Sequence, residues 1–216
     1  MYIKRLLIIL LIAVMISGCG GGSGSSGINA LVPGVTGTTS GGSTVTIKSE
    51  NDTAWSLLRL GPSNFAAAKS SFNNIISSST STNEEKAVAE AGLGWISLKE
   101  NGAASVDPNS SDLKKALTYD STNKEALIGL SIIYLTRSGN EEIGYLESIG
   151  LNSVDYVFTS DYLNITNAQA HSLMALAYYN NGQLSNAEAQ INKAKELDGN
   201  DLTIQQISDS LNSLGF

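Results

Sequence analysis

Residues 168–201 read AQAHSLMALAYYNNGQLSNAEAQINKAKELDGND, and this stretch decides the expected fold. Apolar residues recur at three- and four-residue spacing on both sides of Asn181-Gly182, which is the periodicity of amphipathic helices. The Asn-Gly pair is a turn signal, and Gly199 follows the last apolar positions, where glycine commonly ends a helix. The stretch therefore predicts two helices joined by a tight turn.

This 34-residue unit resembles a tetratricopeptide repeat, which is a helical hairpin of the same length. In that family, small residues at the eighth and twentieth positions let the two helices approach, and here they are Ala175 and Ala187. Two positions depart from the family pattern. His171 replaces the usual tryptophan at the fourth position, and Gly199 replaces the usual proline at the thirty-second.

Further copies of the unit fit the same frame upstream, so first helices are expected to begin near residues 47, 87, 124 and 168. The intervals of 40, 37 and 44 residues each exceed the length of the family's repeat. Loops near 102–111 and 150–166 would absorb most of the excess. Residues 202–214 predict a terminal amphipathic helix that covers the apolar face of the last repeat.

The resemblance implies an all-α fold for residues 47–216. It would be a right-handed superhelical solenoid of about four tetratricopeptide-like hairpins with a C-terminal capping helix. Capping boxes are predicted before two of the first helices, formed by Thr122 with Glu125 and by Thr166 with Gln169. The alternative is a helical bundle whose similarity to the repeat family is accidental.

The N-terminus has the order of a bacterial secretion signal. Lys4 and Arg5 precede eleven apolar residues, 6–16, and a membrane-spanning helix needs about 20. Ile16-Ser17-Gly18-Cys19 then resembles the lipobox of bacterial lipoproteins. This resemblance implies that residues 1–18 are removed and that Cys19 carries two or more acyl chains, enough for stable anchoring. A plain signal peptide or an uncleaved helix is the alternative.

Residues 19–46 contain mostly glycine, serine and threonine after the cysteine, and the first charge beyond them is Lys48. Such a segment cannot bury enough apolar surface to offset its ordering entropy, so we expect a flexible tether. The formal net charge is −7, and loss of Lys4 and Arg5 with the signal makes it −9. This balance disfavours nucleic acid as a partner, because nucleic-acid binding requires clustered cations.

The sequence offers little material for catalysis. His171 is the only histidine and Cys19 the only cysteine, so a zinc site or a nucleophile–base pair is poorly supplied. His171 falls at a position that packs between paired helices, which favours a structural role. No glycine-rich phosphate-binding motif of the Walker type occurs, and the glycine-rich tether lacks the flanking strand and helix that a nucleotide site needs. We expect no enzymatic activity, no cofactor and no metal; an enzyme would need a carboxylate cluster assembled by the fold.

In tetratricopeptide arrays the first helices line a concave groove, and the ninth position of each faces it. Both tryptophans fall on this position, which suggests an apolar strip suited to an extended or helical peptide. The residues expected to line the groove are Trp55, Trp95, Glu125, Ile128, Ile132, Gln169, Ser172, Leu176, Tyr179 and Asn180. The alternative is that Trp55 and Trp95 fill the core of the array.

Lipobox, tether and groove together predict a non-catalytic, membrane-anchored scaffold or adaptor in the bacterial cell envelope. Its partner would be a protein or peptide. Gly20 follows Cys19, whereas an aspartate there marks inner-membrane retention in enteric lipoproteins. The expected location is therefore the outer membrane, facing the periplasm. The alternative function is a small-molecule-binding lipoprotein associated with a solute transporter.

Overall fold

The computed structural model describes residues 47–109, 111–137 and 140–213. The expected signal peptide, Cys19 and the tether lie outside the described residues. Within them every regular element is a helix and no strand occurs, which confirms the all-α class. No helix in this part of the chain is both long and apolar enough to cross a membrane. The elements are α2 (Ile47–Arg59), η1 (Pro62–Asn64), α3 (Phe65–Ser77), α4 (Asn83–Asn101), η2 (Ala103–Ser105), α5 (Asp112–Tyr119), α6 (Lys124–Leu135), α7 (Glu141–Ile149), α8 (Asn167–Asn180), α9 (Leu184–Asp198) and α10 (Leu202–Ser213).

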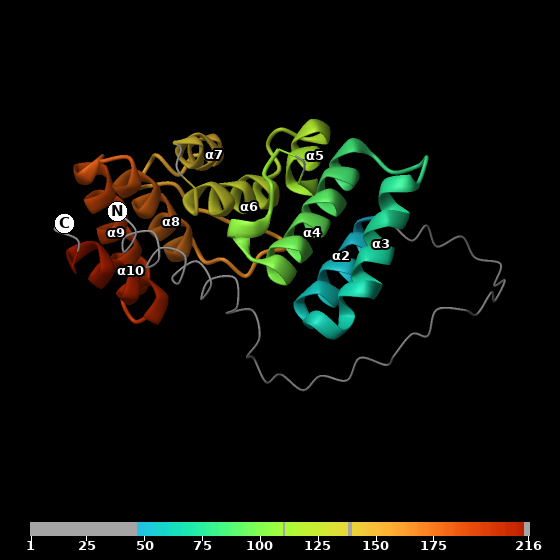
Figure 1. Ribbon diagram of the computed structural model, residues 1–216, viewed down its shortest axis with the longest axis horizontal. Coiled ribbons are helices and arrows are strands. Elements are labelled where there is room, and N and C mark those ends of the chain that lie inside the picture. Colours follow the sequence, from blue (N-terminus) through green and yellow to red (C-terminus); the bar gives the residue numbers. More distant parts are fainter. Residues whose placement is uncertain (1–46, 110, 138–139, 214–216) are drawn as a thin grey trace.

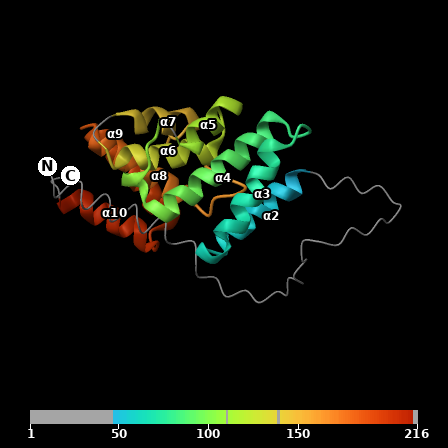
Figure 2. The same ribbon diagram turned by 45° about the vertical axis from the view of Figure 1, so that its right-hand side comes forward.

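Consecutive helices pack in pairs along the length of the molecule (Figure 1). Helix α2 contacts α3, α4 contacts α5, α6 contacts α7, and α8 contacts α9, while α10 packs against α8 and α9. Figure 2 shows the α2–α3 pair at one end of this row and α10 at the other. Helices α2, α4, α6 and α8 begin at residues 47, 83, 124 and 167. The expected starts at 47, 87, 124 and 168 therefore agree within four residues.

Small residues lie where paired helices approach. Counted from the starts expected at residues 47, 87, 124 and 168, the eighth positions are Ala54, Gly94, Ser131 and Ala175, and all four are buried. A Cβ atom added at Gly94 would lie 2.4 Å from Cγ of Leu113 on α5 and 3.0 Å from its backbone nitrogen. Helices α4 and α5 are thus in contact through a position that has no room for a methyl group.

Helix α8 begins at a capping box and ends at a glycine turn, both of which the sequence predicted. The Thr166 side chain accepts a hydrogen bond from the backbone N–H of Gln169, whose side chain accepts from the Thr166 backbone, so this capping box is confirmed. The turn after α8 places Gly182 at φ 72°. The backbone N–H of Gln183 then donates to the carbonyl of Tyr178 at 2.9 Å, which satisfies one of the last carbonyls of the helix.

The capping box predicted from Thr122 and Glu125 is wrong. The cap of α6 is Asn123, whose side-chain oxygen accepts from the backbone N–H of Ala126 at 2.9 Å. Asparagine is a stronger N-cap than threonine, because its carbonyl reaches the free N–H groups of the first turn readily. The Thr122 hydroxyl instead donates to the Asp120 carboxylate at 2.7 Å. The Glu125 side chain is therefore not used in a cap.

Residues 151–166, which we call the insert, connect α7 to α8 without a regular helix. Gly150, at φ 107°, ends α7 in a left-handed conformation that redirects the chain. The sequence predicted only a loop here, but Phe158 and Tyr162 are buried. The insert runs back past α6 as far as the nearer side of α2 (orange in Figure 1), where Nη1 of Arg59 donates to the Tyr162 carbonyl at 3.1 Å.

His171 holds the start of the insert to α8 and α9. Its Nδ1 lies 2.6 Å from Oε1 of Gln190, and its Nε2 lies 3.0 Å from the carbonyl of Tyr156. The Gln190 amide nitrogen donates to the carbonyl of Leu151 at 2.8 Å. His171 and Gln190 are both buried, so the histidine acts as a structural residue between two buried oxygens, to one of which each neutral tautomer donates.

Candidate functional site

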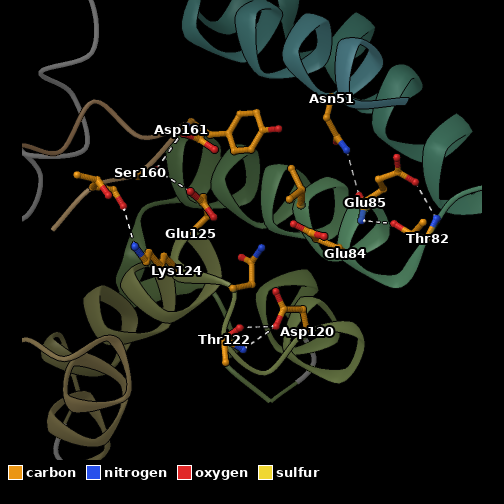
Figure 3. A pocket seen from close by; sticks show the side chains of 14 residues that line it. Asn51, Thr82, Glu84, Glu85, Asp120, Thr122, Lys124, Glu125, Ser160 and Asp161 are labelled. Atoms are coloured by element: carbon orange, nitrogen blue, oxygen red, sulfur yellow. Dashed lines mark hydrogen bonds between the residues drawn. The ribbon is translucent and has the colours of Figure 1, made fainter. Parts of the chain in front are cut away.

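A pocket of ≈ 460 Å³ lies where α2, α4, α6 and the insert meet (Figure 3). Four separate parts of the chain form its wall: α2, the first turn of α4 with its cap, the turn into α6 with that helix's first residues, and the insert. We call it the acidic pocket. It is lined by Asn51, Thr82, Glu84, Glu85, Val88, Asp120, Thr122, Asn123, Lys124, Glu125, Thr159, Ser160, Asp161 and Tyr162.

Glu125 is the most buried carboxylate of the acidic pocket, with an exposed fraction of 7%. Its Oε1 accepts a hydrogen bond from the Ser160 hydroxyl at 2.6 Å, and its backbone carbonyl accepts from Nε1 of Trp95 at 2.9 Å. Burial raises the pKa of the Glu125 carboxyl above its ordinary value; the Ser160 hydroxyl opposes this rise and the Asp161 carboxylate adds to it. A cation nearby would lower the energy of its charged form.

Asn51 contributes an unpartnered acceptor to the wall of the acidic pocket. Its side chain is 1% exposed, and its amide nitrogen donates to the backbone carbonyl of Glu85 at 3.1 Å. That bond fixes which end of the amide is nitrogen, and the remaining oxygen, Oδ1, has no hydrogen-bond partner. A buried acceptor without a donor is costly, so Oδ1 is a position where a ligand or water that donates a hydrogen bond is favoured.

Five carboxylates and one lysine line the acidic pocket. Asp120 accepts hydrogen bonds from the turn that follows it. Glu84 and Asp161 are exposed, and their carboxylates make no hydrogen bond or ion pair among the described residues. The ammonium of Lys124 donates to the backbone carbonyl of Thr159 at 3.2 Å rather than to a carboxylate. The pocket therefore has an excess of negative charge that its own residues do not neutralise.

Tyr162 closes one side of the acidic pocket and joins it to the core. Its ring stacks on Trp55, with centroids 5.3 Å apart and an interplanar angle of 24°. Burial, with smaller contributions from the carboxylates of Asp52 and Asp161, raises the pKa of the Tyr162 hydroxyl to about 12. The insert therefore covers the tryptophan with a neutral side chain, and the hydroxyl serves as a hydrogen-bonding group, not an anion.

The structure corrects the expectation of an open apolar strip at the ninth positions. Trp55 is 1% exposed and Trp95 is 4% exposed, and Ile132 and Leu176 are also buried. The insert covers Trp55 through Tyr162, while the indole of Trp95 donates to α6. Both tryptophans are thus core residues, which was the alternative, and a partner could touch them only after neighbouring residues moved.

The other expected groove residues are not gathered at one surface. Ile128, Ser172 and Tyr179 are buried, and Asn180 is exposed at the end of α8. Gln169 forms the capping box and donates from its amide to the Asp201 carboxylate at 2.8 Å. Of the expected set, Glu125 lines the acidic pocket and the others do not.

Sequence reasoning missed Asn51, Glu84, Ser160 and Asp161 as site residues. Glu84 lies in the first turn of α4, where a carboxylate favours the helix dipole, so its position has a structural explanation that needs no site. The clustering of acidic residues near the starts of two expected first helices was a usable signal. Nothing in the sequence placed the insert, and hence Ser160 and Asp161, beside those helix starts.

Among the described residues, no group of three or more histidine, cysteine, aspartate or glutamate side chains could hold a metal ion. The arrangement instead offers hydrogen-bond acceptors around an open cavity. No family model, no curated protein and no solved structure matches this chain.

Proposed function

We propose that the chain is a non-catalytic interaction protein of the bacterial cell envelope that binds a protein or peptide at the acidic pocket. In this proposal the helix pairs form a tetratricopeptide-like solenoid, and the lipidated Cys19 and the tether hold it at the membrane. The observation that carries the proposal is the pocket itself. Four chain segments meet there and leave carboxylates unpaired beside a buried acceptor.

Two features support the solenoid part of the proposal. The helices pack in consecutive pairs along one row. Small buried residues also recur at the eighth position of each expected unit, as in the repeat family. In repeat arrays each unit buries its apolar face only against its neighbours, and binding surfaces form across several units. The acidic pocket spans α2, α4 and α6 in this way.

Binding is favoured over catalysis by the groups that the acidic pocket presents. They are carboxylates, hydroxyls, amides and one lysine, with no histidine or cysteine among the residues that line it. Glu125 already accepts a hydrogen bond from Ser160, and Glu85 accepts one from the backbone of Thr82. These bonds hold the carboxylates as fixed acceptors, an arrangement suited to recognition of a donor.

A small-molecule site is the second candidate, because a volume of ≈ 460 Å³ falls within the range of small-ligand pockets. Such sites are mostly apolar, whereas Val88 and the ring of Tyr162 are the main apolar groups of this lining. In this candidate the chain would be a lipoprotein that delivers a polar solute to a transporter.

Photo-crosslinking in intact cells tests the proposed partner site. A photoreactive residue at Thr122, which is exposed at the pocket, is expected to capture a reproducible protein partner. Glu188 on α9 is exposed and outside the pocket lining, so the same group there is the matched control. Capture of the same proteins at both positions, or of none at Thr122, would contradict the proposal.

Membrane anchoring is tested separately. Cys19→Ser is expected to abolish incorporation of radiolabelled fatty acid and to block normal removal of residues 1–18, because the lipobox chemistry requires the thiol. Serine at position 17 offers a control, since Ser17→Ala keeps a small residue there. Unchanged labelling of the Cys19→Ser chain would exclude lipid anchoring at this position.

A further inference from the structure

We infer that the acidic pocket recognises an organic cation that carries N–H donors, namely the guanidinium or ammonium group of an arginine or lysine in a partner segment. The inference rests on the proposed function, because it names what the partner presents to the same pocket. A free polyamine offers the same chemistry, and the experiment below separates the two sources.

The charge of the pocket is the first observation. Its five carboxylates come from α4, the turn into α6, α6 itself and the insert, so no single helix explains their convergence. Figure 3 shows Glu84, Asp120, Glu125 and Asp161 around the same opening. Lys124 donates to a backbone carbonyl of the insert, and its single charge does not balance five carboxylates. Carboxylates brought together in this way repel one another, and a bound cation removes that repulsion.

Asn51 is the second observation, and it is independent of the charge. Asn51 belongs to the pocket lining, and its Oδ1 is buried and lacks a partner. The bond from its amide nitrogen to the Glu85 carbonyl prevents the amide from turning over to present a donor instead. A ligand that donates hydrogen bonds is therefore favoured at this wall. A guanidinium has five N–H donors and an ammonium has three, so either satisfies Oδ1 and a carboxylate together.

The cavity also fits a side-chain cation better than a metal ion. No metal-binding group of histidine, cysteine or acidic side chains occurs among the residues that the structure describes. A volume of ≈ 460 Å³ is far larger than a coordinated ion needs. Val88 and the ring of Tyr162 give apolar surface within the same lining, against which the methylene groups of arginine or lysine can lie.

The test uses the full-length chain in mild detergent and three probes: the peptide acetyl-Gly-Arg-Gly-Arg-Gly-amide, the same peptide with citrulline for arginine, and spermidine. Citrulline keeps the shape of arginine and removes its charge. Calorimetry measures binding. Tryptophan fluorescence provides a second readout, because Trp55 contacts Tyr162 and Trp95 bonds to Glu125. The arginine peptide is expected to bind at least about tenfold more tightly than the citrulline peptide.

Variants locate the binding. Glu84→Gln and Asp161→Asn remove exposed charges at the pocket with little risk to folding, and each is expected to weaken binding about threefold to tenfold. Glu188→Gln on α9 removes an exposed charge elsewhere and is expected to leave binding unchanged. Thermal unfolding of each variant confirms that it is folded.

The outcomes separate the inference from the proposed function. Binding of the arginine peptide that the pocket variants weaken supports both. Binding of spermidine alone, weakened by the same variants, supports the cation inference and counts against a protein partner. Equal binding of the arginine and citrulline peptides, or equal weakening by Glu188→Gln, overturns the inference. So does capture of a protein partner at Thr122 when no cation probe binds, a result that leaves the proposed function standing.

Discussion

Replacing Gly94 by alanine measures how closely α4 and α5 approach. The added Cβ would lie 2.4 Å from Cγ and 2.6 Å from Cδ2 of Leu113, and 3.0 Å from the Leu113 backbone nitrogen. Rotation of the leucine side chain relieves the first two contacts but not the third. The helices must therefore separate, and overpacking of this kind costs about 1–3 kcal/mol.

The helix itself gains from the same change. Alanine is more favourable than glycine inside a helix by about 0.5–1 kcal/mol. Gly144 on α7 isolates this gain, because a Cβ added there meets nothing within 4 Å. Gly144→Ala is thus expected to stabilise the chain by about 0.5–1 kcal/mol. Gly94→Ala is expected to destabilise it by about 1–2 kcal/mol, since overpacking exceeds the helical gain.

Thermal unfolding followed by circular dichroism distinguishes the two substitutions. For a chain of this size about 1 kcal/mol corresponds to roughly 2–4 °C in the midpoint, so the variants should shift in opposite directions. In a Leu113→Ala background Gly94→Ala should keep part of its cost, because the side-chain overlap is gone but the 3.0 Å contact with the backbone nitrogen of residue 113 remains. Equal, stabilising shifts for Gly94→Ala and Gly144→Ala would refute the close approach of α4 and α5.

Three further predictions concern buried polar groups. Burial raises the pKa of the Glu142 carboxyl, so its contribution to stability is present below its ordinary pKa and is lost as pH rises through the raised value. Glu142→Gln should therefore raise the unfolding midpoint by about 2–4 °C near pH 7 and change it little near pH 4, and equal shifts at both would contradict this. The pKa of Tyr162 is raised to about 12, so wild-type stability should fall as pH rises from about 10. Tyr162→Phe should lose less stability over that interval, and identical alkaline profiles would argue against the buried hydroxyl. His171→Ala removes the group that faces buried oxygens of Gln190 and Tyr156. It should cost about 1–3 kcal/mol in denaturant unfolding, and a loss below about 0.5 kcal/mol would show that water replaces the imidazole.

The sequence predicted those parts of the fold that depend on local patterns. The Asn181-Gly182 turn and the Thr166–Gln169 cap are short-range features, and both form as expected. The cap of α6 was assigned to the wrong neighbour. Thr122 and Asn123 are both residue types that can cap a helix. Asparagine is preferred over threonine at the N-cap, and the capping-box pattern does not take this preference into account.

The candidate site was mostly beyond sequence reasoning because it depends on the path of the insert. Tyr162 reaches Arg59 and Trp55, which are more than one hundred residues away in the chain. A loop without helical or strand periodicity carries no signal for such contacts. The burial of Trp55 follows from this path. Glu125 alone could be placed near the site, since the helical frame put it at the start of a first helix.

The indole N–H signals of Trp55 and Trp95 in an NMR correlation spectrum test the central claim, cation binding in the acidic pocket, most directly. The Trp95 indole donates to the backbone of Glu125, and the Trp55 indole nitrogen has no partner beneath Tyr162. Both signals are expected to shift when the arginine peptide is added and to stay in place with the citrulline peptide. An absence of shifts, or equal shifts with both peptides, would contradict the claim.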